Sequence, residues 1–128
     1  YGAGFIVNNR LIRGNANFSG EINYLPYVSS RKELIRQCAE DESLISLISK
    51  VLISIITITD PKTIVLCGFR FNDSLLQQVQ EKISKTLPAQ LLPEFYLQRD
   101  ISDEYLTGII SVIQNLLIGQ EPYEDDQF

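Results

Sequence analysis

Histidine, methionine and tryptophan are all missing from this chain of 128 residues, and the missing histidine excludes the most. Histidine is the commonest metal ligand in proteins and the commonest general base near neutral pH. Its absence removes most zinc centres and most acid–base active sites from consideration. We therefore expect no bound metal, no cofactor and no catalytic residue in this chain.

Cysteine is scarce, with Cys38 and Cys67 as the only two. Both lie in apolar segments, and small buried thiols of this kind are typical of proteins in a reducing cytosol. Their separation in the sequence is unlike the close pairs that bind zinc. A disulfide between them is left open, because it depends on geometry that a sequence does not give.

A surplus of positive charge is also lacking, since 11 lysine and arginine residues stand against 16 aspartate and glutamate residues, for a formal net charge of −5. Four of the acidic residues lie in residues 121–128, and removing these four leaves −1 for residues 1–120. We expect this acidic end to be a disordered tail. Without a basic stripe, the chain is not expected to bind nucleic acid directly.

Uninterrupted apolar runs are short. The longest apolar stretch, 44–58, is broken by polar residues at Ser46, Ser49, Lys50, Ser54 and Thr57. No membrane span or signal peptide is therefore predicted, and we expect a cytoplasmic location. The chain also starts at Tyr1 without an initiator methionine, which suggests a piece of a longer protein.

The first half of the chain predicts a hairpin followed by helices. Apolar runs at 5–7 and 11–13 flank two asparagines, which tolerate the left-handed backbone of a tight turn. Residues 14–29 are predicted as loop. Ser30 and Glu33 match a capping box, which opens a short helix to about residue 38.

Asp41 is predicted to cap a second helix over 42–58, whose apolar residues follow helical spacing. This helix has so broad an apolar stripe that we expect it to be buried on more than one side. Its β-branched part, 53–59, could instead form a strand, although the sustained period favours helix. Asp60 and Pro61 are predicted to end it.

The second half alternates strands with helices. Residues 63–67 and 94–98 are predicted strands, and the first is expected to be buried and parallel. Asn72 or Asp73 is predicted to cap the helix between them. A last helix starts at Ser102 or Asp103 and is closed by Gly119; its inward residues are predicted to be Leu106, Ile109, Ile110, Ile113, Leu116 and Leu117. The order indicates an α/β fold with helices covering a mixed sheet.

The stretch RGNANFSGEINYLP, residues 13–26, is the most distinctive part of the sequence. It combines two glycines, three asparagines and one carboxylate, Glu21. Glycines that let the backbone approach closely, beside one acid and several amides, suit a pocket for a sugar or another polyol. They equally suit a plain loop after a hairpin, and composition by itself favours the loop.

Residues 2–118 resemble the ROK family of repressors, open reading frames and sugar kinases. The stretch GAGFIVNNRLIRGNANFSGEINYLP resembles the family segment GAGIIINGKLYRGANGFAGEIGHMP. TDPKTIVLCG resembles the later DPE-IVLGG stretch, and YLTGIISVIQNLL resembles the closing helix. The resemblance implies that residues 1–120 are the carboxy-terminal lobe of an RNase H-like, actin-like ATPase fold, with its first strand missing.

The resemblance also implies candidate site residues. Glu21 occupies the position of the family glutamate that contacts sugar hydroxyls, and Asn17 and Tyr24 are the other candidate sugar-binding residues. Tyr24 stands where the family has a zinc-ligating histidine, and the family's cysteine-rich zinc loop is deleted. Gly68 remains from the family's glycine pair on the adenosine side. The catalytic aspartate and the phosphate loop of the family kinases are absent from this chain.

The resemblance therefore predicts the carboxy-terminal sugar-sensing and dimerisation domain of a transcriptional regulator of the N-acetylglucosamine-repressor and xylose-repressor type. DNA would be bound only through an upstream domain outside this chain. The alternatives are a fragment of an ATP-dependent, glucokinase-like sugar kinase and a degenerate scaffold with no ligand. Because the missing first strand would leave a sheet edge open, we expect a homodimer or larger assembly.

Overall fold

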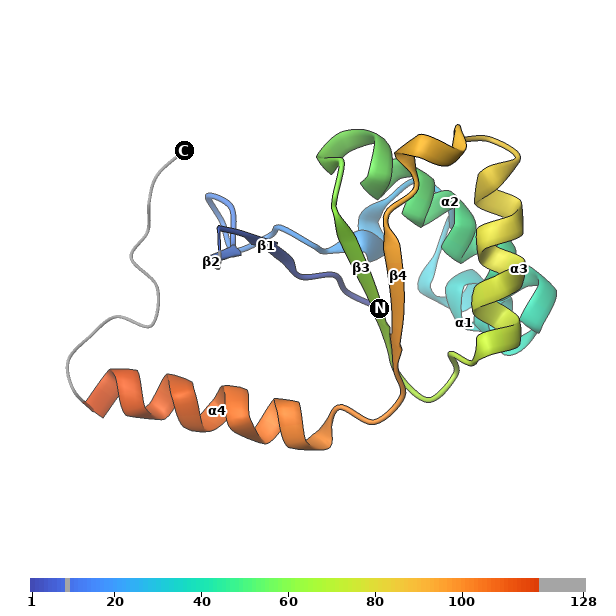
Figure 1. Ribbon diagram of the computed structural model, residues 1–128. Helices are drawn as coiled ribbons and strands as arrows, with labels where there is room; N and C mark the ends of the chain where they lie inside the picture. The colour runs from blue at the N-terminus through green and yellow to red at the C-terminus, as the bar shows by residue number, and fades with distance from the viewer. Residues whose placement is uncertain (9, 118–128) are drawn as a thin grey trace. The chain divides into compact units, whose positions relative to one another are not determined.

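The computed structural model describes residues 1–8 and 10–117, and these form two compact units (Figure 1). One unit takes in Tyr1–Tyr24 and the chain from Ser102 onward, and the other takes in Leu25–Ile101. Each unit is described by itself. The predicted helix end at Gly119 and the predicted acidic tail at 121–128 lie outside the described residues.

The first unit begins with the predicted hairpin. Strands β1 (Phe5–Val7) and β2 (Arg10–Ile12) pair antiparallel, with Phe5 opposite Ile12 and Val7 opposite Arg10. Asn8 has a φ of 50°, the left-handed conformation expected of a tight turn that starts with asparagine. The hairpin is therefore confirmed, with the second strand starting one residue earlier than predicted.

In the second unit, helix α1 (Arg31–Ala39) starts at the predicted capping box. The Ser30 hydroxyl accepts a hydrogen bond of 3.2 Å from the Glu33 backbone N–H. The Glu33 carboxylate reaches back one residue further than in the standard motif and accepts from both the hydroxyl and the backbone N–H of Ser29. These two bonds, with a smaller contribution from the Gln37 amide, lower the pKa of Glu33 below its usual value.

Helix α2 (Asp41–Thr59) is the centre of the second unit. Seven of its residues are buried: Leu44, Ile45, Leu47, Ile48, Ser49, Leu52 and Ile56. This result confirms a helix over the β-branched run, because burial of a broad apolar stripe outweighs local strand propensity. The helix ends at Asp60, whose φ of 43° turns the chain toward Pro61, as predicted.

The predicted cap of α2 is wrong. Asp41 is the first helical residue, and Glu40 precedes it as the N-cap without a side-chain capping bond. The Asp41 carboxylate instead accepts a hydrogen bond of 3.0 Å from the Arg70 guanidinium. Glu40 is also the residue that ends α1, so no loop separates the two helices.

A side-chain hydrogen bond fastens the segment before α1 to α2. The hydroxyl groups of Tyr27 and Ser54 are bonded to each other, and both side chains are partly buried. Tyr27 lies just before α1 in the chain, whereas Ser54 lies in the second half of α2. The two helices are thus joined at Glu40 and again through this pair.

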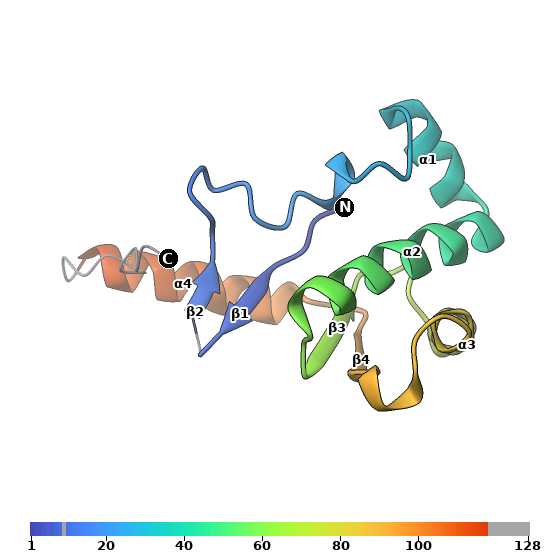
Figure 2. The same ribbon diagram turned by 90° about the horizontal axis from the view of Figure 1, so that it is seen from above.

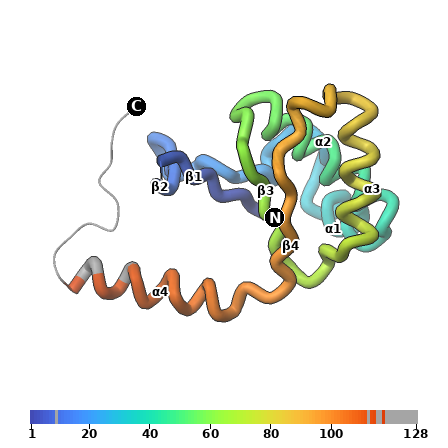
Figure 3. Tube along the Cα trace, in the orientation of Figure 1, coloured from blue at the N-terminus to red at the C-terminus, as the bar shows by residue number. Residues whose placement is uncertain are grey.

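Strands β3 (Thr63–Cys67) and β4 (Glu94–Gln98) pair parallel, as predicted, with Val65 opposite Tyr96. Helix α3 (Asp73–Ser84) connects them, followed by the short 3-10 turn η2 (Ala89–Leu91) (Figure 3). Asn72 caps α3, since its side-chain oxygen accepts a 2.8 Å bond from the Leu75 N–H. Of the two capping residues proposed from the sequence, Asn72 is therefore the cap.

Within the second unit, helices cover one face of this sheet, so the prediction of a buried strand holds for that face alone. Leu66 is buried in the core with α2 and α3, whereas Val65 and Tyr96 on the other face are 52% and 54% exposed. Cys67 is exposed as well, so the prediction that both cysteines are buried is wrong for this one. Figure 2 shows α1 on the side of α2 away from the β3–β4 sheet.

A single mixed sheet is not formed. The described strands make two separate two-stranded sheets, one antiparallel and one parallel. The chain is still a mixed α/β protein, so the fold class is confirmed at that level.

The last helix, α4 (Ser102–Leu117), starts at one of the two predicted residues. Its predicted inward residues are not buried: among those whose side chains are described, the exposed fractions run from 39% at Ile109 to 81% at Leu117. The helical periodicity was sufficient to place the helix. Periodicity did not predict whether the apolar side of the helix is buried.

Helix α2 also has the length and composition of a helix that could cross a membrane. It is the element on which the core of the second unit is built, and core helices meet the same criteria. Its apolar character is therefore accounted for by packing within the unit.

Candidate functional site

The loop after the hairpin folds back on itself through backbone hydrogen bonds. The Ser19 N–H donates to the Arg13 carbonyl at 3.0 Å, and the Asn17 N–H donates to the Gly14 carbonyl at 3.3 Å. Gly14 and Asn17 have φ values of 74° and 53°. Glycine and asparagine are the residues that adopt this left-handed backbone at least cost, which explains their density here.

Gly20 fixes the loop against the start of the chain. Its carbonyl oxygen accepts a 2.8 Å hydrogen bond from the Ala3 N–H, and its φ is 89°. A Cβ at this position would lie 1.8 Å from the Ala3 carbonyl oxygen, well inside any van der Waals contact. Only glycine allows the two backbone segments to approach this closely.

The residues after Gly20 form a single 3-10 turn, η1 (Ile22–Tyr24). The Tyr24 N–H donates to the Glu21 carbonyl at 3.1 Å, and the Asn23 side-chain amide donates to the Tyr1 carbonyl. The Tyr24 ring packs at a tilt of 55° against Phe18, with ring centroids 5.1 Å apart. The backbone that carries Glu21 is thus held on both sides.

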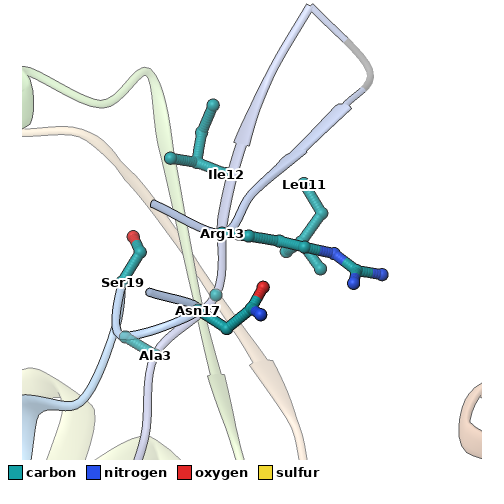
Figure 4. Close-up of a pocket in the computed structure, with 7 residues that line it drawn as sticks. Ala3, Leu11, Ile12, Arg13, Asn17 and Ser19 are labelled. Carbon is teal, nitrogen blue, oxygen red and sulfur yellow. The ribbon is translucent and has the colours of Figure 1, made fainter. Parts of the chain in front are cut away.

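A hollow of about 380 Å³ opens beside this loop and the base of the hairpin (Figure 4). Its lining residues are Ala3, Gly4, Leu11, Ile12, Arg13, Asn17 and Ser19. Figure 4 shows the side chains of Leu11, Arg13 and Asn17 extending to one side of the ribbon, with Ile12 and Ser19 on the other. The hollow is wide open to solvent, unlike the enclosed clefts that bury most of a small molecule.

The structure brings one of the three predicted sugar-binding residues to this hollow. Asn17 lines it, whereas Glu21 and Tyr24 are exposed and outside the lining. The Tyr24 ring packs against Phe18 instead. The Glu21 carboxylate has no hydrogen bond or ion pair with any residue in 1–8 or 10–117.

The sequence pattern did not identify the two other polar lining residues, Arg13 and Ser19. Both are ordinary loop residues in a sequence. Their shared position depends on the Ser19 N–H bond to the Arg13 carbonyl, which closes the loop. The glycine at 14 was the available signal, because it indicates a sharp reversal immediately after Arg13.

Gly68, the predicted nucleotide-site remnant, lies in the other unit. It follows β3 directly, has a φ of 125°, and donates its N–H to the Gln98 carbonyl at 3.0 Å. Its carbonyl accepts from the Phe71 N–H at 3.2 Å, so the residue forms a turn between β3 and α3.

The side chains around the hollow are of kinds that bind ligands by hydrogen bonds and apolar contact. An amide, a guanidinium and one aliphatic side chain lie on one side of the ribbon, and a hydroxyl and a second aliphatic side chain lie on the other. Groups of these kinds can hydrogen-bond hydroxyl groups. Within residues 1–8 and 10–117, no three cysteine, aspartate or glutamate residues are grouped as a metal site requires. None of the lining side chains is a carboxylate that could act as a general base.

No protein-family model, curated protein or solved structure matches this chain.

Proposed function

We propose that this chain is the carboxy-terminal part of a cytoplasmic ROK-type transcriptional regulator, in which it senses a sugar and supports dimerisation without phosphorylating its ligand. The observation that supports this proposal best is the loop at residues 13–24. It has the glycines and asparagine in the conformations that a close-approach loop needs, and it borders a hollow of about 380 Å³. DNA contacts would belong to an upstream domain.

In this proposal Asn17 and Glu21 act as the hydrogen-bonding residues. Asn17 donates and accepts through its amide at the edge of the hollow, which matches a sugar hydroxyl in either role. Glu21 follows Gly20 directly, and its carboxylate is exposed and could accept two hydroxyl protons. Proteins of this family bind sugar between two lobes, and this chain would supply one of them. By itself it would therefore bind weakly.

Calorimetry with N-acetylglucosamine, glucose and xylose tests the proposal. We expect weak binding of at least one of the three, lost in Glu21→Ala and reduced in Asn17→Ala. Asn15→Ala is the matched control, because Asn15 is an exposed residue of the same type in the same loop and lies outside the lining of the hollow. Submillimolar binding that survives Glu21→Ala would defeat the assignment of Glu21.

A fragment of an ATP-dependent sugar kinase is the second candidate, and the conformation of Gly68 favours it. A glycine with a φ of 125° at the carboxyl end of a parallel strand, directly before a helix, is the arrangement that many nucleotide sites use. Phosphoryl transfer also needs an aspartate base, a phosphate loop and bound Mg²⁺, which would have to come from elsewhere. Calorimetric titration with ADP and Mg²⁺ distinguishes the two, since the regulator is expected to give no heat of binding.

A further inference from the structure

Helix α1 presents a basic face to solvent within the second unit. Its five exposed residues are Arg31, Lys32, Ile35, Arg36 and Ala39. At about 100° per residue, these five occupy one continuous arc of roughly 140° around the helix. The other four side chains of the helix are partly buried on the opposite side, where Cys38 packs against the core. The basic face therefore consists of three cations with one large apolar side chain, Ile35, among them.

The positive charge of the basic face is not balanced by a neighbouring carboxylate. The Glu33 carboxylate, the only one in α1, accepts hydrogen bonds from Ser29. Arg36 makes the smallest contribution to the lowered pKa of Glu33 and forms no ion pair with it. Within residues 1–8 and 10–117, Arg31 and Lys32 form no ion pair either. All three cations can therefore pair with an anion supplied from outside.

Two of these cations lie where they weaken the helix. Arg31 and Lys32 are the first two residues of α1, and the aligned peptide dipoles disfavour positive charge at the amino end of a helix. Both side chains are exposed, so packing does not account for them either. Residues that contradict a local rule of stability are expected mainly where they serve binding.

Acidic residues limit the extent of the basic face. Glu40, Asp41 and Glu42 follow α1 directly and are all exposed, and the whole chain has a formal charge of −5. Nucleic acid and anionic membranes present negative charge over a long or flat surface, which would meet these carboxylates as well as the cations. A short acidic segment meets the cations alone, so its charge complements this surface better.

Ile35 adds an apolar contact to the charges. Its side chain is 63% exposed and lies between the cations on the arc. Contacts to nucleic-acid phosphates make no use of such a side chain, and one large apolar residue on a nine-residue helix is too little for membrane insertion. A protein segment can supply both kinds of contact, since protein interfaces combine apolar anchors with a polar rim.

We propose that the basic face of α1 is a docking surface for a short acidic segment of another protein. Carboxylates of that segment pair with Arg31, Lys32 and Arg36, and one of its apolar side chains contacts Ile35. The helix is only about 13 Å long, so the interface is small and its binding is weak and salt-dependent. This docking is independent of the sugar binding proposed above.

Fluorescence anisotropy of the whole chain with a labelled acidic amphipathic peptide, EELEELLEEL, tests the surface. The test variant replaces the three cations of the basic face with glutamine. The control variant removes the same amount of charge at three other exposed positions: Lys62→Gln, Lys82→Gln and Lys85→Gln. Physiological salt is used because it screens charges beyond about 8 Å, so that only cations beside the peptide contribute.

We expect the dissociation constant to rise about tenfold or more in the test variant and less than about twofold in the control. Ile35→Ala should weaken peptide binding by a few fold through the lost apolar contact. Equal effects of the two triple variants would overturn the proposal, as would a wild-type chain that does not bind the peptide up to about 1 mM.

Two other anionic probes test the kind of partner. A double-stranded oligonucleotide and vesicles that contain phosphatidylserine should both bind more weakly than the peptide, because they also meet the carboxylates that follow α1. Tighter binding of either probe than of the peptide would overturn the assignment to an acidic protein segment.

Thermal melts separate docking from a structural role. Because Arg31 and Lys32 oppose the helix dipole, replacing both with glutamine should leave the Tm unchanged or raise it slightly while peptide binding weakens. A Tm that falls in this double variant would show that the two cations stabilise the fold, and would count against the docking surface.

Discussion

Replacing Gly20 with alanine tests how the loop at residues 13–24 is held. The added Cβ would lie 1.8 Å from the Ala3 carbonyl oxygen, so the two segments must separate by more than 1 Å to reach ordinary contact, on the order of the 3 Å minimum between a Cβ and an oxygen. Both clashing atoms are fixed to the backbone, so no rotamer change can relieve the contact. The segments should therefore part, and the Ala3 N–H should lose its 2.8 Å bond to the Gly20 carbonyl.

The size of the effect follows from these contributions. A non-glycine residue at a φ of 89° costs about 1–2 kcal/mol, and the lost hydrogen bond costs about 1 kcal/mol more. We expect the closed form of the loop to be destabilised by about 2–3 kcal/mol, which corresponds to a population change of roughly 30-fold to more than 100-fold.

Amide hydrogen exchange followed by NMR measures this directly at Ala3. The exchange rate of the Ala3 N–H should rise in Gly20→Ala and approach that of an unstructured amide. Gly2→Ala is the control, since its Cβ would lie 4.0 Å from the Gly20 carbonyl oxygen, an ordinary contact, and its φ is not positive. Unchanged protection of Ala3 in Gly20→Ala would refute the close-approach argument.

Four further changes have expected outcomes in thermal or chemical melts monitored by circular dichroism. Glu33 has a lowered pKa, so its contribution to the α1 cap is present above the usual carboxyl value of 4.5 and is lost as the pH falls through the lowered pKa; Glu33→Ala should remove this part of the pH dependence. Asn72→Ala removes the cap of α3 and should cost about 1 kcal/mol. Leu44→Ala, at a fully buried position, should cost about 3–5 kcal/mol, against less than about 1 kcal/mol for Ile35→Ala at 63% exposure. Gly108→Ala should stabilise α4 by up to about 1 kcal/mol, because alanine has the higher helix propensity and an added Cβ meets nothing within 4 Å. Equal melts for Leu44→Ala and Ile35→Ala would contradict the assigned core.

The positions of the helices and strands could be predicted because their signals are local. The Ser30 capping box, the Asn72 cap and the left-handed Asn8 each involve residues within a few positions of one another. The parallel pairing of β3 with β4 followed from a strand, helix and strand in succession. Among the described residues, the starts of the helices and the bounds of the strands moved by at most one residue.

The errors concern what lies opposite each element, which depends on contacts distant in the sequence. Val65 and Cys67 look like core residues in an apolar run, yet they face away from α2 and α3. The apolar residues of α4 were predicted to face a core because periodicity shows which side of a helix is apolar without showing what covers it. At the hollow, the predicted residue Asn17 is one of those that line it, whereas Arg13 and Ser19 come together through a backbone bond between positions six residues apart.

The shared residue between α1 and α2 has a consequence for chain length. Glu40 is the only residue at the junction, so its φ and ψ, −105° and 129°, set the angle between the two helices. The hydrogen bond between Tyr27 and Ser54 links the segment before α1 to α2, so α1 is connected to α2 at both of its ends. One residue inserted within α2 between Glu40 and Ser54 would turn Ser54 about 100° around the helix axis. The Ser54 hydroxyl would then point away from Tyr27. Exposed loops usually accept extra residues, but a residue added to this part of α2 would break the hydrogen bond between Tyr27 and Ser54.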